Sequence, residues 1–157
     1  MSNYRIAQIC ENGDLITDSA DVFPDECRKH CVKCGARTIS ACPSCNASIL
    51  GVRGDYPDYE NYHIPYYCHE CGTPYPWTSK ILDGAVEILA LDTDLDPKIK
   101  EIVKEAIPGL IIDSPLASVA AAKYATHIPK ASELVRNSLH NLLIDLISES
   151  AKKMLLG

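Results

Sequence analysis

The sequence predicts an α+β fold, with short antiparallel strands over residues 1–77 followed by a helical module over residues 78–157. Two observations indicate this division. Three Cys-x-x-Cys pairs fall within 41 residues of the first half, a pattern typical of small metal-stapled β structure. All eight cysteines and seven of the eight tyrosines precede residue 78, and the rest is rich in Ala, Leu, Ile and Lys. We therefore expect two domains, 1–77 and 78–157.

The first expected element is a β-hairpin. Residues 4–9 and 15–17 flank an Asn-Gly turn, and this dipeptide favours hairpins because both residues tolerate positive φ. Cys10 therefore lies at the tip of the hairpin. Further short strands are expected at residues 38–40, 48–50 and 74–77, and a polar, tyrosine-bearing loop at residues 51–65.

The second half carries helix start signals. Asp96 precedes Pro97 and Ser114 precedes Pro115, and a capping residue followed by proline favours the first helical turn. Helices are expected at about residues 78–91, 97–108, from 115 onward, and 130–156. The acidic run from Asp92 superficially resembles a calcium loop, but it lacks the mid-loop glycine, so we interpret it as helix capping.

The last expected helix has a wide apolar stripe at spacings of three and four residues. Three uses fit this stripe: packing on the chain's own helices, self-association into a homo-oligomer, and binding to a membrane surface. Basic residues are sparse along it, which disfavours the membrane surface.

The cysteine spacing predicts zinc. The two sulfurs of a Cys-x-x-Cys turn point at one tetrahedral ion, and a second pair closes the shell. Disulfides are the alternative, but no secretion signal is recognisable, so we expect reduced thiols and a cytoplasmic protein. Two structural zinc ions per chain are predicted, with these ligands: Cys10, Cys27, Cys31, Cys34, Cys42, Cys45, Cys68 and Cys71.

The second and third Cys-x-x-Cys pairs are separated by 22 residues, a typical ribbon spacing, and we assign them to one ion. The first pair then takes Cys10 and a fourth ligand. Cys27 completes the count of eight thiolates, Asp14 offers a carboxylate four residues after Cys10, and water or histidine are the remaining candidates. In an alternative pairing, the first and third pairs share an ion.

The motifs stand in the order Gln8-Ile9-Cys10-x-Asn-Gly, Cys31-x-x-Cys-Gly, Cys42-Pro-x-Cys-Asn and Cys68-x-x-Cys-Gly-x-x-Tyr75-Pro76-Trp77-Thr78. This order resembles an uncharacterised bacterial double-zinc-ribbon family, a domain of unknown function, over nearly the whole chain. The resemblance implies two ribbons and an amphipathic C-terminal helical region. Members of that family typically carry histidine where this chain has Asp14. The family has no settled activity, so the resemblance implies no reaction.

The charge balance disfavours nucleic acid. The net charge is −6, and each four-thiolate zinc site adds about −2. Affinity for nucleic acid depends largely on neutralising phosphates. A local basic patch nevertheless comes from Arg28, Lys29, Lys33 and Arg37. The apolar runs are far shorter than the roughly 20 residues that span a bilayer.

We therefore expect a non-catalytic binding or adaptor protein, with a protein partner and with Tyr56, Tyr59 and Tyr62 as candidate contact residues. A closed four-cysteine shell has no room for substrate. The alternatives are a nucleic-acid-binding protein and a zinc-dependent hydrolase at the Cys10 site, the latter if water completes that shell.

Overall fold

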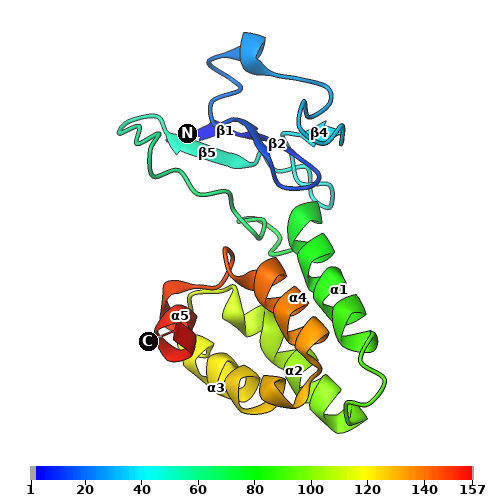
Figure 1. Ribbon diagram of the computed structural model, residues 1–157. Coiled ribbons are helices and arrows are strands. Elements are labelled where there is room, and N and C mark those ends of the chain that lie inside the picture. The colour runs from blue at the N-terminus through cyan, green and yellow to red at the C-terminus, as the bar shows by residue number, and fades with distance from the viewer. Residues whose placement is uncertain (1–2, 157) are drawn as a thin grey trace. The chain divides into compact units, whose positions relative to one another are not determined.

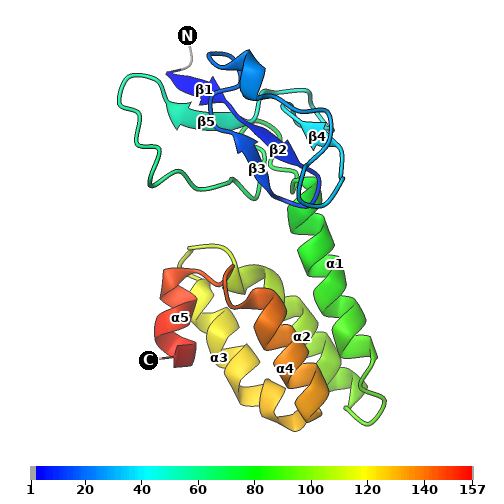
Figure 2. The same ribbon diagram turned by 45° about the horizontal axis from the view of Figure 1, so that its top comes forward.

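The computed structural model describes residues 3–156, and it has the α+β composition that the sequence predicts (Figures 1 and 2). The chain forms two compact units, Met1–Lys80 and Ile81–Gly157. Short antiparallel strands lie in the first unit, and helices make up most of the second. Helix α1 (Pro76–Ala90) begins in the first unit and continues into the second.

The first unit holds two small antiparallel sheets. Strand β1 (Tyr4–Ile6) pairs with β5 (Leu50–Arg53). Strand β2 (Gln8–Cys10) lies between β3 (Leu15–Thr17) and β4 (Thr38–Ile39). The predicted β2–β3 hairpin therefore forms, and it carries Cys10 at the end of β2.

Three of the expected strands differ from the structure. The strand expected at residues 48–50 is shifted, because β5 covers Leu50–Arg53, and the loop expected from residue 51 therefore begins only after β5. The strand expected at residues 4–9 is divided at Ala7, which is fully buried and donates its N–H to Ile49 O at 2.9 Å, so the chain passes there from one sheet to the other. The strand expected at residues 74–77 is wrong, because α1 already begins at Pro76. Proline favours the first helical turn, where a missing N–H costs no hydrogen bond.

The first unit has a small core that includes two of the cysteines. Its buried members are Ala7, Ile9, Cys42, Ile49, Cys68, Tyr75 and Trp77. The Tyr75 and Trp77 rings stack with centroids 4.8 Å apart, and Trp77 Nε1 donates to Pro65 O at 2.9 Å. So little apolar volume favours a fold that depends on bound metal.

The second unit is a helical bundle with a larger core. It contains the rest of α1 and four further helices: α2 (Pro97–Leu110), α3 (Ala117–His127), α4 (Glu133–Leu143) and α5 (Glu149–Leu156). The predicted Asp96 cap is confirmed, since its carboxylate accepts from Lys98 N at 2.8 Å. Helices α2 and α3 pack closely at Gly109, where an added Cβ would lie 2.7 Å from Ala120 Cβ.

The single helix expected at residues 130–156 is wrong: it is two helices, α4 and α5, separated by residues 144–148. In this break Ser148 N donates to Leu110 O at 2.8 Å, and Ser148 Oγ accepts from Ala151 N at 3.2 Å. The serine thus satisfies the start of α5 and ties it to the end of α2.

The apolar stripe of these two helices is mostly used inside the second unit. Its buried positions are Val135, Leu139, Leu143, Ile147 and Ala151. Leu134 and Met154 stay exposed. Self-association through the stripe stays a prediction, with fewer apolar side chains available for it. None of the described helices is both long and apolar enough to cross a bilayer.

Candidate metal centres

The second and third Cys-x-x-Cys pairs form one compact group of sulfurs. The Sγ atoms of Cys42 and Cys71 lie 3.8 Å apart, and those of Cys45 and Cys68 lie 3.6 Å apart. All four sulfurs fall within 4.8 Å of one another. A Zn–S distance of about 2.3 Å places the sulfurs of a tetrahedral shell about 3.8 Å apart. The group therefore already has the dimensions of a four-thiolate metal shell.

Each pair is shaped by a turn that reverses the chain beneath the sulfurs. Cys68 N donates to Thr73 O at 2.9 Å, and Gly72 N donates to Cys68 O at 2.9 Å. Cys42 makes the equivalent bonds with Ala47 and Asn46, both at 2.8 Å. The residue that follows each pair has positive φ, 72° at Gly72 and 64° at Asn46. Glycine and asparagine are the residues that adopt this conformation most readily.

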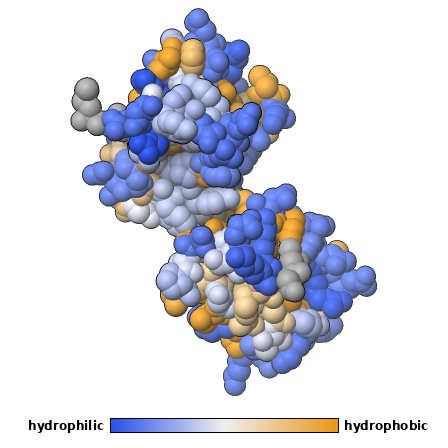
Figure 3. Space-filling model, turned by 90° about the vertical axis from the view of Figure 1, so that its left-hand side faces the viewer, coloured by the Kyte–Doolittle hydropathy of each residue, from blue (hydrophilic) through white to orange (hydrophobic). Residues whose placement is uncertain are grey.

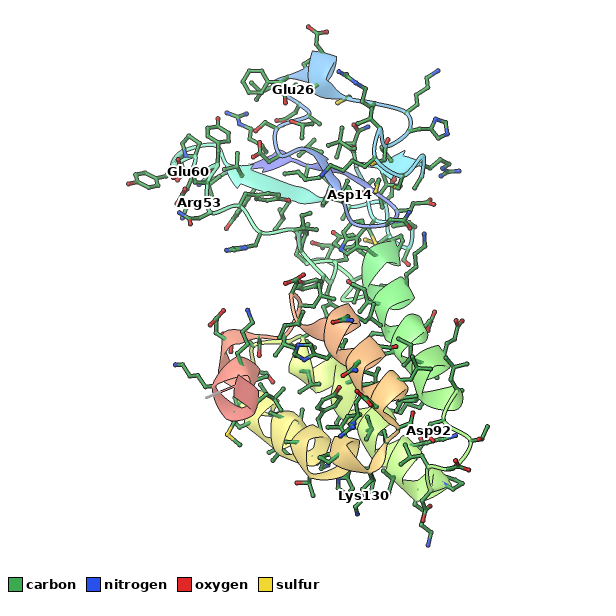
Figure 4. All side chains as sticks on the ribbon, in the orientation of Figure 1. Asp14, Glu26, Arg53, Glu60, Asp92 and Lys130 are labelled. Carbon is green, nitrogen blue, oxygen red and sulfur yellow. The ribbon has the colours of Figure 1, made fainter. Side chains whose placement is uncertain are left out.

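A second group joins the hairpin to the first Cys-x-x-Cys pair, and its fourth member is a carboxylate. The Sγ atoms of Cys10 and Cys34 lie 3.7 Å apart, and Asp14 Oδ2 lies 3.7 Å from Cys10 Sγ and 3.5 Å from Cys31 Sγ. In a tetrahedral shell of mixed donors, sulfur and oxygen are about 3.5 Å apart. Figure 4 shows Asp14 at this end of the hairpin. These four ligand atoms also fit a single ion.

Two side chains outside the first group, Asn12 and Lys80, form a hydrogen-bonded series that contacts it. Asn12 Nδ2 donates to Cys34 Sγ at 3.3 Å, and Lys80 Nζ donates to Asn12 Oδ1 at 2.7 Å. Backbone hydrogen bonding at Ala36 and the Asn12 amide together lower the pKa of Cys34. This arrangement favours the thiolate, which is the form of cysteine that binds metal.

The second group has its own thiolate-stabilising contacts. Backbone hydrogen bonds from Cys71 and Glu70 lower the pKa of Cys68 to about 6. Hydrogen bonding with Thr73 lowers the pKa of Cys71. The effect is confined to part of each group, since burial raises the pKa of Cys10, and burial with the neighbouring thiols raises the pKa of Cys45 to about 12. Each group therefore has at least one cysteine whose thiolate form is favoured.

The single tryptophan lies beside both groups. An added Cβ on Gly13, in the turn of the first group, would lie 3.0 Å from Trp77 Cβ. Trp77 stacks on Tyr75, which is buried in the same core cluster as Cys42 and Cys68. Only glycine fits at position 13, where φ is 95° and Trp77 occupies the adjoining space.

Residues 3–155 match a protein family described as uncharacterized proteins conserved in bacteria (DUF2321). The chain belongs to this family. The affiliation that the motif order predicts is confirmed, and both cysteine groups of this family member are compatible with zinc ribbons. No curated protein and no solved structure matches the chain significantly. Membership supports the fold and gives no activity.

Cys27 is the predicted ligand that this member of the family does not bring to either group. It follows the short 3₁₀ turn η1 (Pro24–Glu26) and lies in the wall of a different surface cavity. Asp14, the alternative considered from the sequence, lies where the fourth ligand is needed. The hairpin turn explains this, since Cys10 N donates to Asp14 O at 2.9 Å and Asp14 N donates to Cys10 Sγ at 3.3 Å.

Two contributors were not recognisable from sequence. Asn12 could be read only as a turn residue, although its side chain also reaches Cys34. Lys80 is 68 residues away from Asn12, and no local pattern indicates their contact. Such outer contacts follow from the folded arrangement alone.

Two surface features of the first unit complete the candidate site. The tyrosine loop, residues 54–63, borders a groove of about 380 Å³ whose lining includes Tyr56, Tyr62 and Arg53. A second, shallow cavity of about 440 Å³ is lined by Cys27, by His30 and by three residues of the predicted basic patch, Arg28, Lys29 and Arg37; Lys33 is not part of this lining. Figure 3 faces the side from which the tyrosine loop projects, and apolar side chains appear there only in separate small areas.

Proposed function

We propose that the chain is a cytoplasmic, non-catalytic binding protein, stabilised by two structural zinc ions, whose first unit presents the tyrosine loop to a protein partner. The observation that carries this proposal is the pair of compact four-ligand groups. Each group fills a tetrahedral shell with protein atoms and leaves no position for substrate, as in structural zinc sites. A hydrolase at the Cys10 site would need water where Asp14 Oδ2 lies.

The tyrosine loop supports partner binding because aromatic side chains are held outward. Tyr56 is 79% exposed and Tyr59 is 55% exposed. Tyr62, the third candidate contact residue, instead turns inward and donates its hydroxyl to Leu50 O at 2.7 Å. Exposed tyrosines on a fixed loop bury much apolar area on binding at low entropic cost.

Polar contacts at both ends hold the loop in place. Arg53 binds Asp55 with an N–O distance of 2.8 Å, and Asn61 Nδ2 donates to Asp58 Oδ2 at 2.7 Å. Figure 4 shows Arg53 and Glu60 in this part of the first unit. Such contacts reduce the conformational freedom of the loop, which lowers the entropic cost of binding a partner.

The binding test is a pull-down with the whole zinc-loaded chain as bait. Tyr56→Ala combined with Tyr59→Ala should abolish stoichiometric capture of the partner, with metal content unchanged. Phe23→Ala is the matched control, because Phe23 is also an exposed aromatic of the first unit but lies outside the loop. Capture undiminished by the double substitution would remove the loop from the proposal.

Elemental analysis tests the metal part of the proposal directly. We expect close to two zinc ions per purified chain. Thiols that are oxidised to one another, with no bound ion, would contradict the proposal.

Nucleic-acid binding is the second candidate, and one observation favours it. The shallow cavity gathers three Arg and Lys side chains on a chain of net charge −6. Binding through such a patch would weaken steeply as salt rises. Electrophoretic shift assays at low salt, with single- and double-stranded DNA and RNA, decide the matter. No shift with any of them would end this candidate.

A further inference from the structure

We infer that the first centre, formed by Cys10, Asp14, Cys31 and Cys34, is the exchangeable metal site of the chain, and that the Asp14 carboxylate is the ligand that yields. The second centre, formed by Cys42, Cys45, Cys68 and Cys71, releases its ion much more slowly. This inference rests on the zinc loading proposed above and assigns different roles to the two ions.

The donor atoms separate the two centres. Asp14 Oδ2 takes the place that sulfur takes in the second centre, 3.5 Å from Cys31 Sγ and 3.7 Å from Cys10 Sγ. Structural zinc is normally held by cysteine and histidine. A carboxylate oxygen is a harder donor that suits magnesium, calcium and manganese better, whereas thiolates select zinc and other soft ions. Zinc is therefore held by three soft donors in the first centre and by four in the second.

The two centres do not differ in their exposure to solvent. In the first centre Cys10 and Cys31 are buried, Cys34 is exposed and Asp14 is half-buried. In the second centre two cysteines are likewise buried and two are exposed. A chelator or an accepting ligand can thus reach an edge of either centre, and the donor type becomes the deciding difference.

The hairpin allows the carboxylate to leave while the three thiolates stay in place. Backbone bonds fix the turn: Cys10 N donates to Asp14 O at 2.9 Å, and Asp14 N donates to Cys10 Sγ at 3.3 Å. Asp14 can therefore swing by rotation about its own side-chain bonds. Cys34 stays oriented by Asn12, which is held in turn by Lys80.

The exchange is a ligand substitution without any redox change. Asp14 would give up its coordination position to a donor atom of the incoming ligand, so that one ligand replaces another at the bound ion. An incoming thiolate or a chelating nitrogen or oxygen ligand can then draw the ion away from the three remaining sulfurs. The chemical class served by this centre is a soft divalent cation in transfer to or from such a ligand.

The test follows zinc release from the whole two-zinc chain to the chromogenic chelator 4-(2-pyridylazo)resorcinol. We expect one equivalent to leave in a fast phase and one in a slow phase. Asp14→Cys should slow the fast phase roughly tenfold or more, within the range seen when groups around metal ligands are changed. Asp58→Cys is the control for an added thiol, because Asp58 lies on the tyrosine loop, and it should leave both phases unchanged.

The reciprocal variant, Cys71→Asp, gives the second centre the same donor set and should make its ion leave in a fast phase as well. Substitution with cobalt gives an independent reading, since Asp14→Cys should increase the thiolate-to-cobalt charge-transfer absorption of the loaded chain. Two ions that leave the native chain at one rate would overturn the inference and leave the proposed function intact. A fast phase unchanged by Asp14→Cys would do the same. A chain that binds no zinc would end both.

Discussion

At the scale of single residues, Asp92 shows how a buried carboxylate organises the second unit (Figure 4). The side chain is only 6% exposed. Its Oδ1 accepts from Asp94 N at 3.2 Å and Leu95 N at 3.1 Å, and its Oδ2 accepts from Ser132 N at 2.7 Å. The acidic run thus stabilises backbone amides, in agreement with the capping role expected from the sequence. It also joins the α1–α2 connection to the start of α4.

Replacing Asp92 with asparagine should lower the melting temperature at neutral pH. The hydrogen bond from Ser132 N is the largest cause of the lowered pKa of Asp92. A carboxyl with a lower pKa in the folded state adds stability above its unfolded pKa of about 3.9 and loses that contribution as pH falls through the folded pKa. The difference between native and variant melting temperatures should therefore shrink on acidification.

Circular dichroism at several pH values measures this difference, and Asp94→Asn is the control. Asp94 is exposed, so its carboxylate can be replaced without losing the three backbone contacts. Equal melting temperatures for the native chain and Asp92→Asn at neutral pH would contradict the assigned role.

Tyr62 gives a second residue-scale prediction. Burial, and to a lesser degree the charge of Asp18, raise the pKa of the phenol, which stays neutral and donates to Leu50 O. Tyr62→Phe removes this hydrogen bond and should destabilise the first unit by about 1 kcal/mol. Denaturant titration followed by Trp77 fluorescence measures the change. Tyr59→Phe, at an exposed position, should leave the midpoint where it is.

At the scale of elements, two helical glycines form a natural comparison. An added Cβ at Gly109 in α2 would meet Ala120 Cβ at 2.7 Å, whereas at Gly84 in α1 it would meet Leu142 Cδ2 at an ordinary 3.7 Å. Gly109→Ala should therefore destabilise the bundle by about 1–3 kcal/mol through overpacking. Gly84→Ala should stabilise it by about 0.5–1 kcal/mol through helix propensity.

Thermal unfolding of both glycine variants provides the measurement. The opposite signs of the two stability changes are the decisive result. Alanine favours helix at both positions, and only the neighbouring side chain differs. A stabilising Gly109→Ala would show that α2 and α3 are not in close contact there.

The start of α2 could be predicted because an Asp-Pro cap is a local signal, and Asp96 caps α2 as expected. The Ser114-Pro115 signal placed the next helix too early, since α3 begins at Ala117 and has no side-chain cap. At α4 the capping residue is Ser132, which accepts from Val135 N at 3.4 Å and was not identified from the sequence. The break between α4 and α5 was not legible, because Ser148 looks like an ordinary surface residue of a long amphipathic helix. Its role depends on Leu110 O, which only the folded bundle brings near.

The metal ligands divide in the same way. Regular Cys-x-x-Cys spacing made the second group predictable, whereas two members of the first group, Cys10 and Asp14, come from outside any such pair. Counting thiols favoured Cys27, and the folded hairpin instead places Asp14 beside Cys10. For the fourth member of this group, the position of Asp14 in the hairpin was a better guide than the number of cysteines in the chain.

At the scale of the whole molecule, we expect different interactions to stabilise the folded state of each unit. The core cluster of the helical unit has sixteen buried residues, whereas that of the first unit has seven, two of them cysteines. Structural zinc in small domains contributes on the order of 10 kcal/mol to folding. Stability of the first unit should therefore depend on metal, and that of the second on apolar burial.

Strong chelation should accordingly unfold one half of the chain. We expect the buried environment of Trp77 to be lost, seen as a red shift of its fluorescence, while the far-ultraviolet helical signal falls only slightly. Adding zinc back under reducing conditions should restore the fluorescence. Fluorescence that is unchanged after both ions have been removed would show that the first unit holds its shape without metal.

The hairpin turn also affects the chemical stability of its Asn-Gly dipeptide. An Asn-Gly sequence is prone to spontaneous deamidation, in which the glycine nitrogen attacks the asparagine side chain and a carboxylate results. In the folded chain Gly13 N is engaged with Cys10 O at 2.9 Å, and the Asn12 amide is occupied by Cys34 and Lys80. The same bonds that orient a metal ligand therefore protect this dipeptide from chemical decay, and partial unfolding of the turn would remove that protection.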